Sequence, residues 1–152
     1  MPDPEQQAVT PSDQDEFLTR LVGLANRKGL GIGVVLQVHG TVVKGELCSA
    51  TDYWSELAEQ VGRLDPPTQL AVAARDKIAN DFKAIGASLR KRLDDDESAP
   101  HAPIHVHLRN AVVLVGANSL DAPLWRGRLA SVDGFSLARK QDEGSSSTAK
   151  VG

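Results

Sequence analysis

The residues of this sequence whose types and spacing could do chemistry begin with a pair of histidines. His105 and His107 are two positions apart in the segment IHVHLR, so both imidazoles lie on one face if the segment is a β-strand. Imidazole binds zinc and copper, but a zinc site needs three or four ligands. His101 and His39 could join the pair, although no spacing fixes a third ligand. An exposed polar strand face is the simpler interpretation, and we expect no bound metal or cofactor.

Arginines form the second candidate group. Arg126 and Arg128 are also two positions apart, and on a strand they project together from the face opposite Trp125. With Arg109 on a neighbouring predicted strand, they could form a patch that binds carboxylates or other anions. The competing interpretation is a solvated strand face with cross-strand ion pairs.

Catalytic signatures are not found. The sequence contains no G-x-S-x-G elbow, no P-loop and no G-x-G-x-x-G motif. The run GLGIG at residues 29–33 leads into a predicted strand, whereas a phosphate cradle leads into a helix. Asp133 is explained by a turn. We therefore predict no catalytic residue.

Composition and charge are those of one ordinary globular domain. The 152 residues are 41% hydrophobic and 24% charged, with a formal net charge of −3. Residues 1–16 carry five acids and no base, whereas residues 100–139 carry four arginines and two acids. The imbalance is too small to predict nucleic-acid binding. The only cysteine, Cys48, fits a reducing compartment, and no secretory signal or membrane-length apolar run is present, so we predict a cytoplasmic protein.

Apolar periodicity predicts three helices and one hairpin before residue 100. The first helix is capped by Thr10 or Ser12, has an apolar face over residues 17–25 and ends at Gly29. Residues 32–48 alternate about a turn at His39-Gly40 and predict a hairpin, with a bulge or bend at Gly45. Helices over residues 49–64 and 68–93 follow, and the apolar stripe of the longer one could cover the sheet or form a helix–helix seam in an oligomer.

Residues 104–140 predict a four-stranded meander. Its strands are expected at residues 104–109, 112–115, 124–132 and 135–139, with tight turns at Asn110-Ala111 and Asp133-Gly134. The predicted fold class is α+β, with a bent, mainly antiparallel sheet and about three helices. By analogy, the sheet could be a small, partly closed barrel of the Sm-like kind. We expect a disordered arm at residues 1–11, a single α+β domain at 12–140 and a flexible tail at 141–152.

Three stretches of the sequence resemble a known family. They are LRNA from Leu108, WRGRLASVDGFSL from Trp125, and the hairpin GTVVKGELCSATDYW from Gly40. Together they resemble the gas vesicle protein U family of accessory proteins, over roughly residues 17–140. Residues 65–99 match least and could be a helical insertion. The resemblance implies a non-enzymatic, gas vesicle associated protein that acts in vesicle assembly or clustering through contacts with shell or other accessory proteins, and that self-associates.

The positions that match the family motifs are predicted to determine the fold, with one exception. The glycines allow bends and turns, Trp125 and Phe135 belong to the core, and Arg126, joined by Arg128, is expected to contact a partner. The fold-determining set is Gly40, Gly45, Trp125, Gly127, Asp133, Gly134 and Phe135.

Two alternatives stay open at this point. A small Sm-like module could bind nucleic acid through Arg109, Arg126 and Arg128, although the net charge of −3 and the scarcity of aromatic residues argue against it. A metal-binding protein could use His105 and His107.

Overall fold

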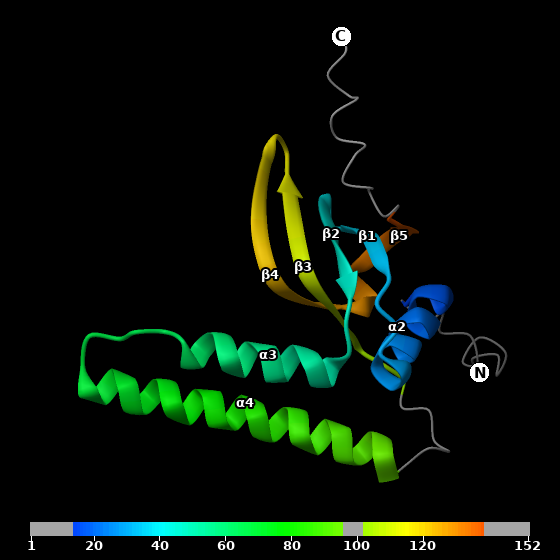
Figure 1. Cartoon of the computed structure of the whole chain (residues 1–152). Helices are drawn as coiled ribbons and strands as arrows, with labels where there is room; N and C mark the ends of the chain where they lie inside the picture. Colours follow the sequence, from blue (N-terminus) through cyan, green and yellow to red (C-terminus); the bar gives the residue numbers. More distant parts are fainter. Residues whose placement is uncertain (1–13, 96–101, 139–152) are drawn as a thin grey trace, which may run out of the picture.

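The structure, a computed structural model, describes residues 14–95 and 102–138 and combines helices with one antiparallel sheet. The arm predicted at residues 1–11 and the tail predicted at 141–152 lie outside these ranges. With the labels of Figure 1, the elements are α2 (Glu16–Lys28), β1 (Gly33–Val38), β2 (Thr41–Leu47), α3 (Ala50–Gly62), α4 (Gln69–Asp95), β3 (His105–Val115), β4 (Asn118–Arg128) and β5 (Val132–Leu137). A single 3-10 turn, Leu129–Ser131, joins β4 to β5. The predicted α+β class is confirmed.

The sheet has the strand order β4-β3-β2-β1-β5, and every neighbouring pair is antiparallel. In the described residues it is open, with β4 and β5 as its edges, so the partly closed barrel suggested by analogy is not formed. Figure 1 shows α3 lying across one end of the sheet, with α4 on the far side of α3. The helical pair therefore touches the sheet through α3.

The turn predicted at Asn110-Ala111 is wrong, because both residues lie inside strand β3. The strand runs unbroken past these residues, and its hairpin with β4 turns at Gly116, whose φ is 60°. The pairing with β2 slips by one residue opposite Gly45, so that Asn110 and Ala111 together form a β-bulge. Asn110 has a φ of 50°, a conformation that asparagine tolerates in bulges as well as in turns. The bend predicted at Gly45 is present, and a Cβ there would lie 3.2 Å from the Cα of Ala111.

The turn predicted at Asp133-Gly134 is also wrong. Both residues belong to β5, which pairs with β1 and not with β4, so the expected four-stranded meander is replaced by a β3–β4 hairpin and a strand that returns to the far edge. The register shifts between Gln37 and Val38, opposite Asp133. There the Asp133 carboxylate accepts a hydrogen bond of 2.8 Å from the backbone N–H of His39. Asp133 therefore supports the predicted β1–β2 turn, in which His39 and Gly40 both have positive φ.

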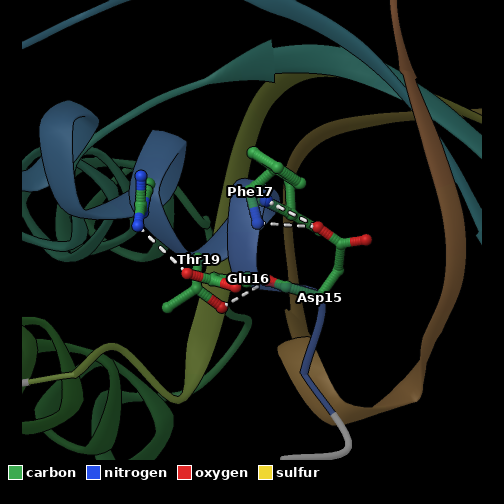
Figure 2. Close-up of polar contacts among 6 residues, drawn as sticks. Asp15, Glu16, Phe17 and Thr19 are labelled. Carbon is green, nitrogen blue, oxygen red and sulfur yellow. Dashed lines mark hydrogen bonds and ion pairs between the residues drawn. The ribbon is translucent and has the colours of Figure 1, made fainter.

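An aspartate, Asp15, caps the N-terminus of helix α2. Oδ1 of Asp15 accepts hydrogen bonds from the backbone N–H groups of Phe17 and Leu18, both at 2.9 Å, and Figure 2 shows this cap. The Thr19 hydroxyl donates to the Asp15 carbonyl oxygen at 2.7 Å. Thr10 and Ser12, the predicted caps, lie outside the described residues. At the other end Gly29, with a φ of 66°, stops the helix as predicted.

The core lies between α2 and one face of the sheet. Helix α2 buries Leu18, Val22 and Ala25, whereas Phe17 and Leu24, expected on the apolar face, are exposed. The sheet contributes Val34, Leu36, Val43, Leu47, Val106, Leu108, Ala111 and Val132, and the 3-10 turn adds Leu129. Trp125 and Phe135 pack against this cluster. The predicted apolar face is therefore confirmed at Leu18, Leu21 and Ala25 and wrong at Phe17 and Leu24.

Helix α4 packs against α3 and not against the sheet. Only Ala79 and Gly86 of its 27 residues are buried, and both belong to the line that faces α3. The rings of Trp54 in α3 and Phe82 in α4 lie 5.3 Å apart. One flank of the long apolar stripe therefore forms a helix–helix contact within the chain. The other flank is exposed.

In the Trp125-Arg126-Gly127 segment of β4, a glycine is needed at position 127 because the Trp125 ring occupies the space of a side chain there. The indole of Trp125 folds over Gly127, and a Cβ built on Gly127 would overlap the indole ring. Val106 of β3 is the cross-strand neighbour of Gly127 and is fully buried. A larger residue would have to push the indole off this site.

We expect Gly127→Ala to lower the free energy of unfolding by about 1–3 kcal/mol, because the added methyl group displaces a half-buried tryptophan. Chemical denaturation followed by tryptophan fluorescence measures this change. Gly23→Ala is the matched control: a Cβ there meets nothing within 4 Å, so this helix-interior change should stabilise by about 0.5–1 kcal/mol. Equal effects of the two substitutions would contradict the packing described.

Candidate functional site: the face of β3 and β4 beside α3

The candidate residues are brought together by the register of β3 and β4. His107 pairs with Arg126 and His105 pairs with Arg128 across the two strands. Directly opposed residues of an antiparallel pair share a face. The face opposite the core therefore carries both histidines and these two arginines, with Arg109 further along β3. The two-residue spacings predicted that each pair shares one strand face, but they did not predict that the histidines and the arginines form one group.

Arg109 is held by α3. Its guanidinium lies 3.4 Å from Oδ2 of Asp52 and 3.5 Å from Oε1 of Glu56, one helical turn apart. The Arg109 side chain is 32% exposed, so the ion pairs are partly shielded from water. Cys48 lies close by, and burial raises the pKa of its thiol to about 11, an effect that Arg109 partly offsets. Arg109 thus joins the helical pair to the sheet and is not a free cation, and Cys48 stays a neutral thiol.

His107 is buried beneath α3. It is 4% exposed, and its ring centroid is 4.6 Å from that of Tyr53. Nε2 of His107 accepts a hydrogen bond of 3.2 Å from Nε of Arg126. Burial, together with the charges of Arg126 and His105, lowers the pKa of His107 to about 3. The imidazole is therefore neutral, and because Nε2 is the acceptor its proton is on Nδ1.

Arg126 and Arg128 differ in how many side-chain contacts hold their guanidinium groups. The guanidinium carbon of Arg126 sits 5.4 Å from the centre of the Trp54 ring in a cation–π contact. Its Nε is already committed to His107. The Arg128 side chain is exposed, and no hydrogen bond or ion pair joins its guanidinium to a described side chain. The three arginines therefore do not form one uniform row.

The histidines do not converge with other metal-binding groups. Their ring centroids are 6.4 Å apart, His39 lies in the β1–β2 turn, and His101 is outside the described residues. Within residues 14–95 and 102–138, no three or more His, Cys, Asp or Glu side chains are arranged to hold a metal ion.

Sequence reasoning missed the part that α3 plays in this site. Asp52, Glu56, Tyr53 and Trp54 contact the strand face, yet only their spacing along one helix was visible in the sequence. The pair Asp52 and Glu56, four residues apart, was the available signal for a cation across from α3.

The fold and this face define an α+β protein in which polar side chains join a helical pair to a sheet. The family model for gas vesicle protein GvpU-like proteins matches residues 15–140. The chain therefore belongs to the GvpU-like family, as the resemblance implied. No curated protein and no solved structure matches the chain. Among the described helices, none is long and apolar enough to cross a membrane.

His107 makes the stability of the protein depend on pH. Its pKa is lowered in the folded state from an ordinary value of 6.5 to about 3, so below pH 6.5 the unfolded chain binds a proton that the folded chain does not. The free energy of unfolding should therefore fall with pH from about 6.5 towards 3, with a slope that approaches about 1.4 kcal/mol per pH unit from this group. We expect His107→Gln to have a shallower slope between pH 6.5 and 5, measured by urea denaturation.

His39→Asn is the control for this experiment. His39 is exposed in a turn at a φ of 48°, which asparagine tolerates, so its removal should leave the slope close to that of the unmodified protein. A His107→Gln slope equal to that of the unmodified protein would contradict a neutral, buried imidazole.

Proposed function

We propose that this protein is a non-enzymatic accessory factor that acts in gas vesicle assembly or clustering, in the cytoplasm, through protein–protein contacts. Its partners are the vesicle shell, other accessory proteins and further copies of itself. Membership of the GvpU-like family supports the link to gas vesicles. The observation that carries the contact function is the outer flank of α4.

The outer flank of α4 carries three large apolar side chains that the described fold leaves exposed. Leu70 is 83% exposed, Ile78 44% and Ile85 38%. At about 100° per residue these three side chains fall within an arc of about 80° on the helix surface, well apart from Ala79 and Gly86, which face α3. Exposed large apolar side chains aligned on one helix flank suit a protein contact surface. This flank suits either a second copy of the helix or an apolar surface on the vesicle.

Arg128, with Arg126 beside it, supplies the second contact in this proposal. Both belong to β4, an edge strand whose outer backbone groups are not paired with another strand of the sheet. Pro123 and Asp121 on the same strand disfavour the addition of a partner strand. Side-chain contacts to partner carboxylates are therefore the more suitable use of this edge. Arg109 is no longer part of the contact, because Asp52 and Glu56 already neutralise it.

We expect the double variant Leu70→Glu/Ile78→Glu to lower self-association and binding to gas vesicles at least about tenfold, because two charges interrupt the apolar strip. Analytical ultracentrifugation of the protein alone, and co-sedimentation with purified vesicles, measure the two effects. Asn80→Glu/Ala87→Glu is the matched control, since these residues are exposed on the opposite flank of α4. A protein that stays monomeric and does not sediment with vesicles would contradict the proposal.

Charge reversal of Arg128 tests the second contact. We expect Arg128→Glu to weaken vesicle binding about 3- to 10-fold at low salt and less at high salt, because exposed charges are screened. Arg20→Glu is the control, because Arg20 is an exposed arginine of α2 and its ion pair among the described residues is with Glu16. Equal weakening by both substitutions would show a general charge effect and would remove Arg128 from the contact.

A further inference from the structure

Charged residues interrupt the outer flank of α4 near its middle. Leu70, Ile78 and Ile85 are exposed on this flank, and at about 100° per residue Asp81 falls inside the arc that they span. Lys77 lies at the edge of the same arc, one helical turn before Asp81. A partner that covers the apolar side chains must therefore also supply a group that suits a carboxylate.

Asp81 and Lys77 form an ion pair within the helix. Nζ of Lys77 lies 3.1 Å from Oδ2 of Asp81, and the side chains are 78% and 60% exposed. An exposed pair with this spacing adds little to the stability of a helix. Most of the surface of both side chains is therefore available for a contact between molecules.

A second copy of α4 presents the complementary charges when it runs antiparallel. A two-fold axis opposite the centre of the segment 77–81 brings Lys77 of each copy level with Asp81 of the other. Each carboxylate then has two ammonium groups beside it, one from its own helix and one from the second copy. A parallel pair would oppose like charges at both positions. In Figure 1, α4 lies on the outside of the described fold, where a second helix can approach it.

The apolar side chains of the flank fit the same register. With a rise of about 1.5 Å per residue, the Ile78 side chains of the two copies are offset by about 3 Å along the helix axis and meet at the centre. Ile85 of one copy comes level with a point between Leu70 and Ala74 of the other. The steps from Ala74 to Ile78, Asp81 and Ile85 alternate between four and three residues, which is the spacing of helices that pack side by side.

The position of Asp81 makes such a contact specific and weak. A polar group in the seam between two helices costs stability and fixes their register. The shared length from Leu70 to Ser88 is about 27 Å, so with a helix width of about 10 Å each copy contributes about 300 Å² of helix face. Contacts of this size belong to weak, reversible associations.

We propose that α4 pairs antiparallel with α4 of a second copy through its outer flank, and that contacts between Lys77 and Asp81 set the register. This pairing rests on the proposed function, because it identifies one of the partners named there. A weak contact becomes effective when many copies are held on one surface, because each pair raises the effective concentration for the next.

Charge exchange between the two positions tests the pairing. Lys77→Glu and Asp81→Lys each place like charges opposite one another at two symmetric points, so each variant alone should dimerise about 10- to 100-fold more weakly than the unmodified protein. An equimolar mixture of the two variants restores opposite charges at both points. It should form a heterodimer with an affinity within about threefold of the original. Sedimentation velocity of the full chain at low ionic strength measures these affinities.

Arg63→Glu is the matched control for the single variants. It replaces the ion pair between Arg63 and Glu59, which are also one helical turn apart but belong to α3, by two like charges. The loss of helix stability should be similar to that in the Lys77 and Asp81 variants. The dimer affinity should stay that of the unmodified protein, because neither residue lies on the outer flank of α4.

Single variants that dimerise as tightly as the unmodified protein would overturn the pairing, because like charges already face each other in a parallel pair. A mixture no tighter than either variant alone would overturn it too. So would a protein that is monomeric at all concentrations, whether another segment of the chain or the vesicle covers the flank. Co-sedimentation with purified vesicles separates this result from the proposed function, since vesicle binding without dimers removes only the α4 pair.

Discussion

The docking of the first turns of α3 on β3 is the interaction on which the other surfaces depend. The backbone N–H of Cys48, just before α3, donates to the carbonyl oxygen of His107 at 3.0 Å. The backbone N–H of Ala50, the first residue of α3, donates a hydrogen bond to the side-chain oxygen of Asn26 in α2. Arg109 of β3 adds two ion pairs to α3. These contacts fix one end of α3 between the sheet and α2. The contact of Arg126 with Trp54 and the outward position of α4 follow from that placement.

The same docking divides three similar arginines into different roles. Arg109 is partly buried with two carboxylates, and removal of its partners would leave an unpaired charge in a shielded place. Part of the Arg126 guanidinium is already engaged, because it lies over the Trp54 ring and its Nε donates a hydrogen bond to the neutral imidazole of His107. Arg128, beyond the reach of α3, keeps its guanidinium in water. Charge that is already paired adds little to docking, whereas exposed charge steers a partner and sets its orientation. Position relative to α3, and not residue type, therefore decides which arginine can serve a partner.

Local patterns predicted most elements of the fold and failed where pairing is long-range. The helices and the β1–β2 hairpin follow from apolar periodicity and from turn residues that act within a few positions. Asn110 and Asp133-Gly134 were read as turns, because the conformations that favour a turn also favour a bulge inside a strand. No local signal shows that β5 returns to β1, since that pairing depends on the whole sheet. The two-residue spacings predicted that His105 and His107 share one strand face and that Arg126 and Arg128 share another. The β3–β4 pairing that joins the two groups, and the ion pair between Arg109 and Asp52, 57 residues apart in sequence, were not predictable from local patterns.

Hydrogen–deuterium exchange of the full chain, alone and with purified gas vesicles, tests the central claim most directly. With α3 anchored and contacts made outside it, the first turns of α3 and the β1–β2 hairpin should exchange slowly in both states. The account predicts added protection with vesicles in α4 and near Arg128 in β4. Fast exchange in the first turns of α3 without vesicles, or vesicle-induced protection confined to β1 and β5, would contradict it.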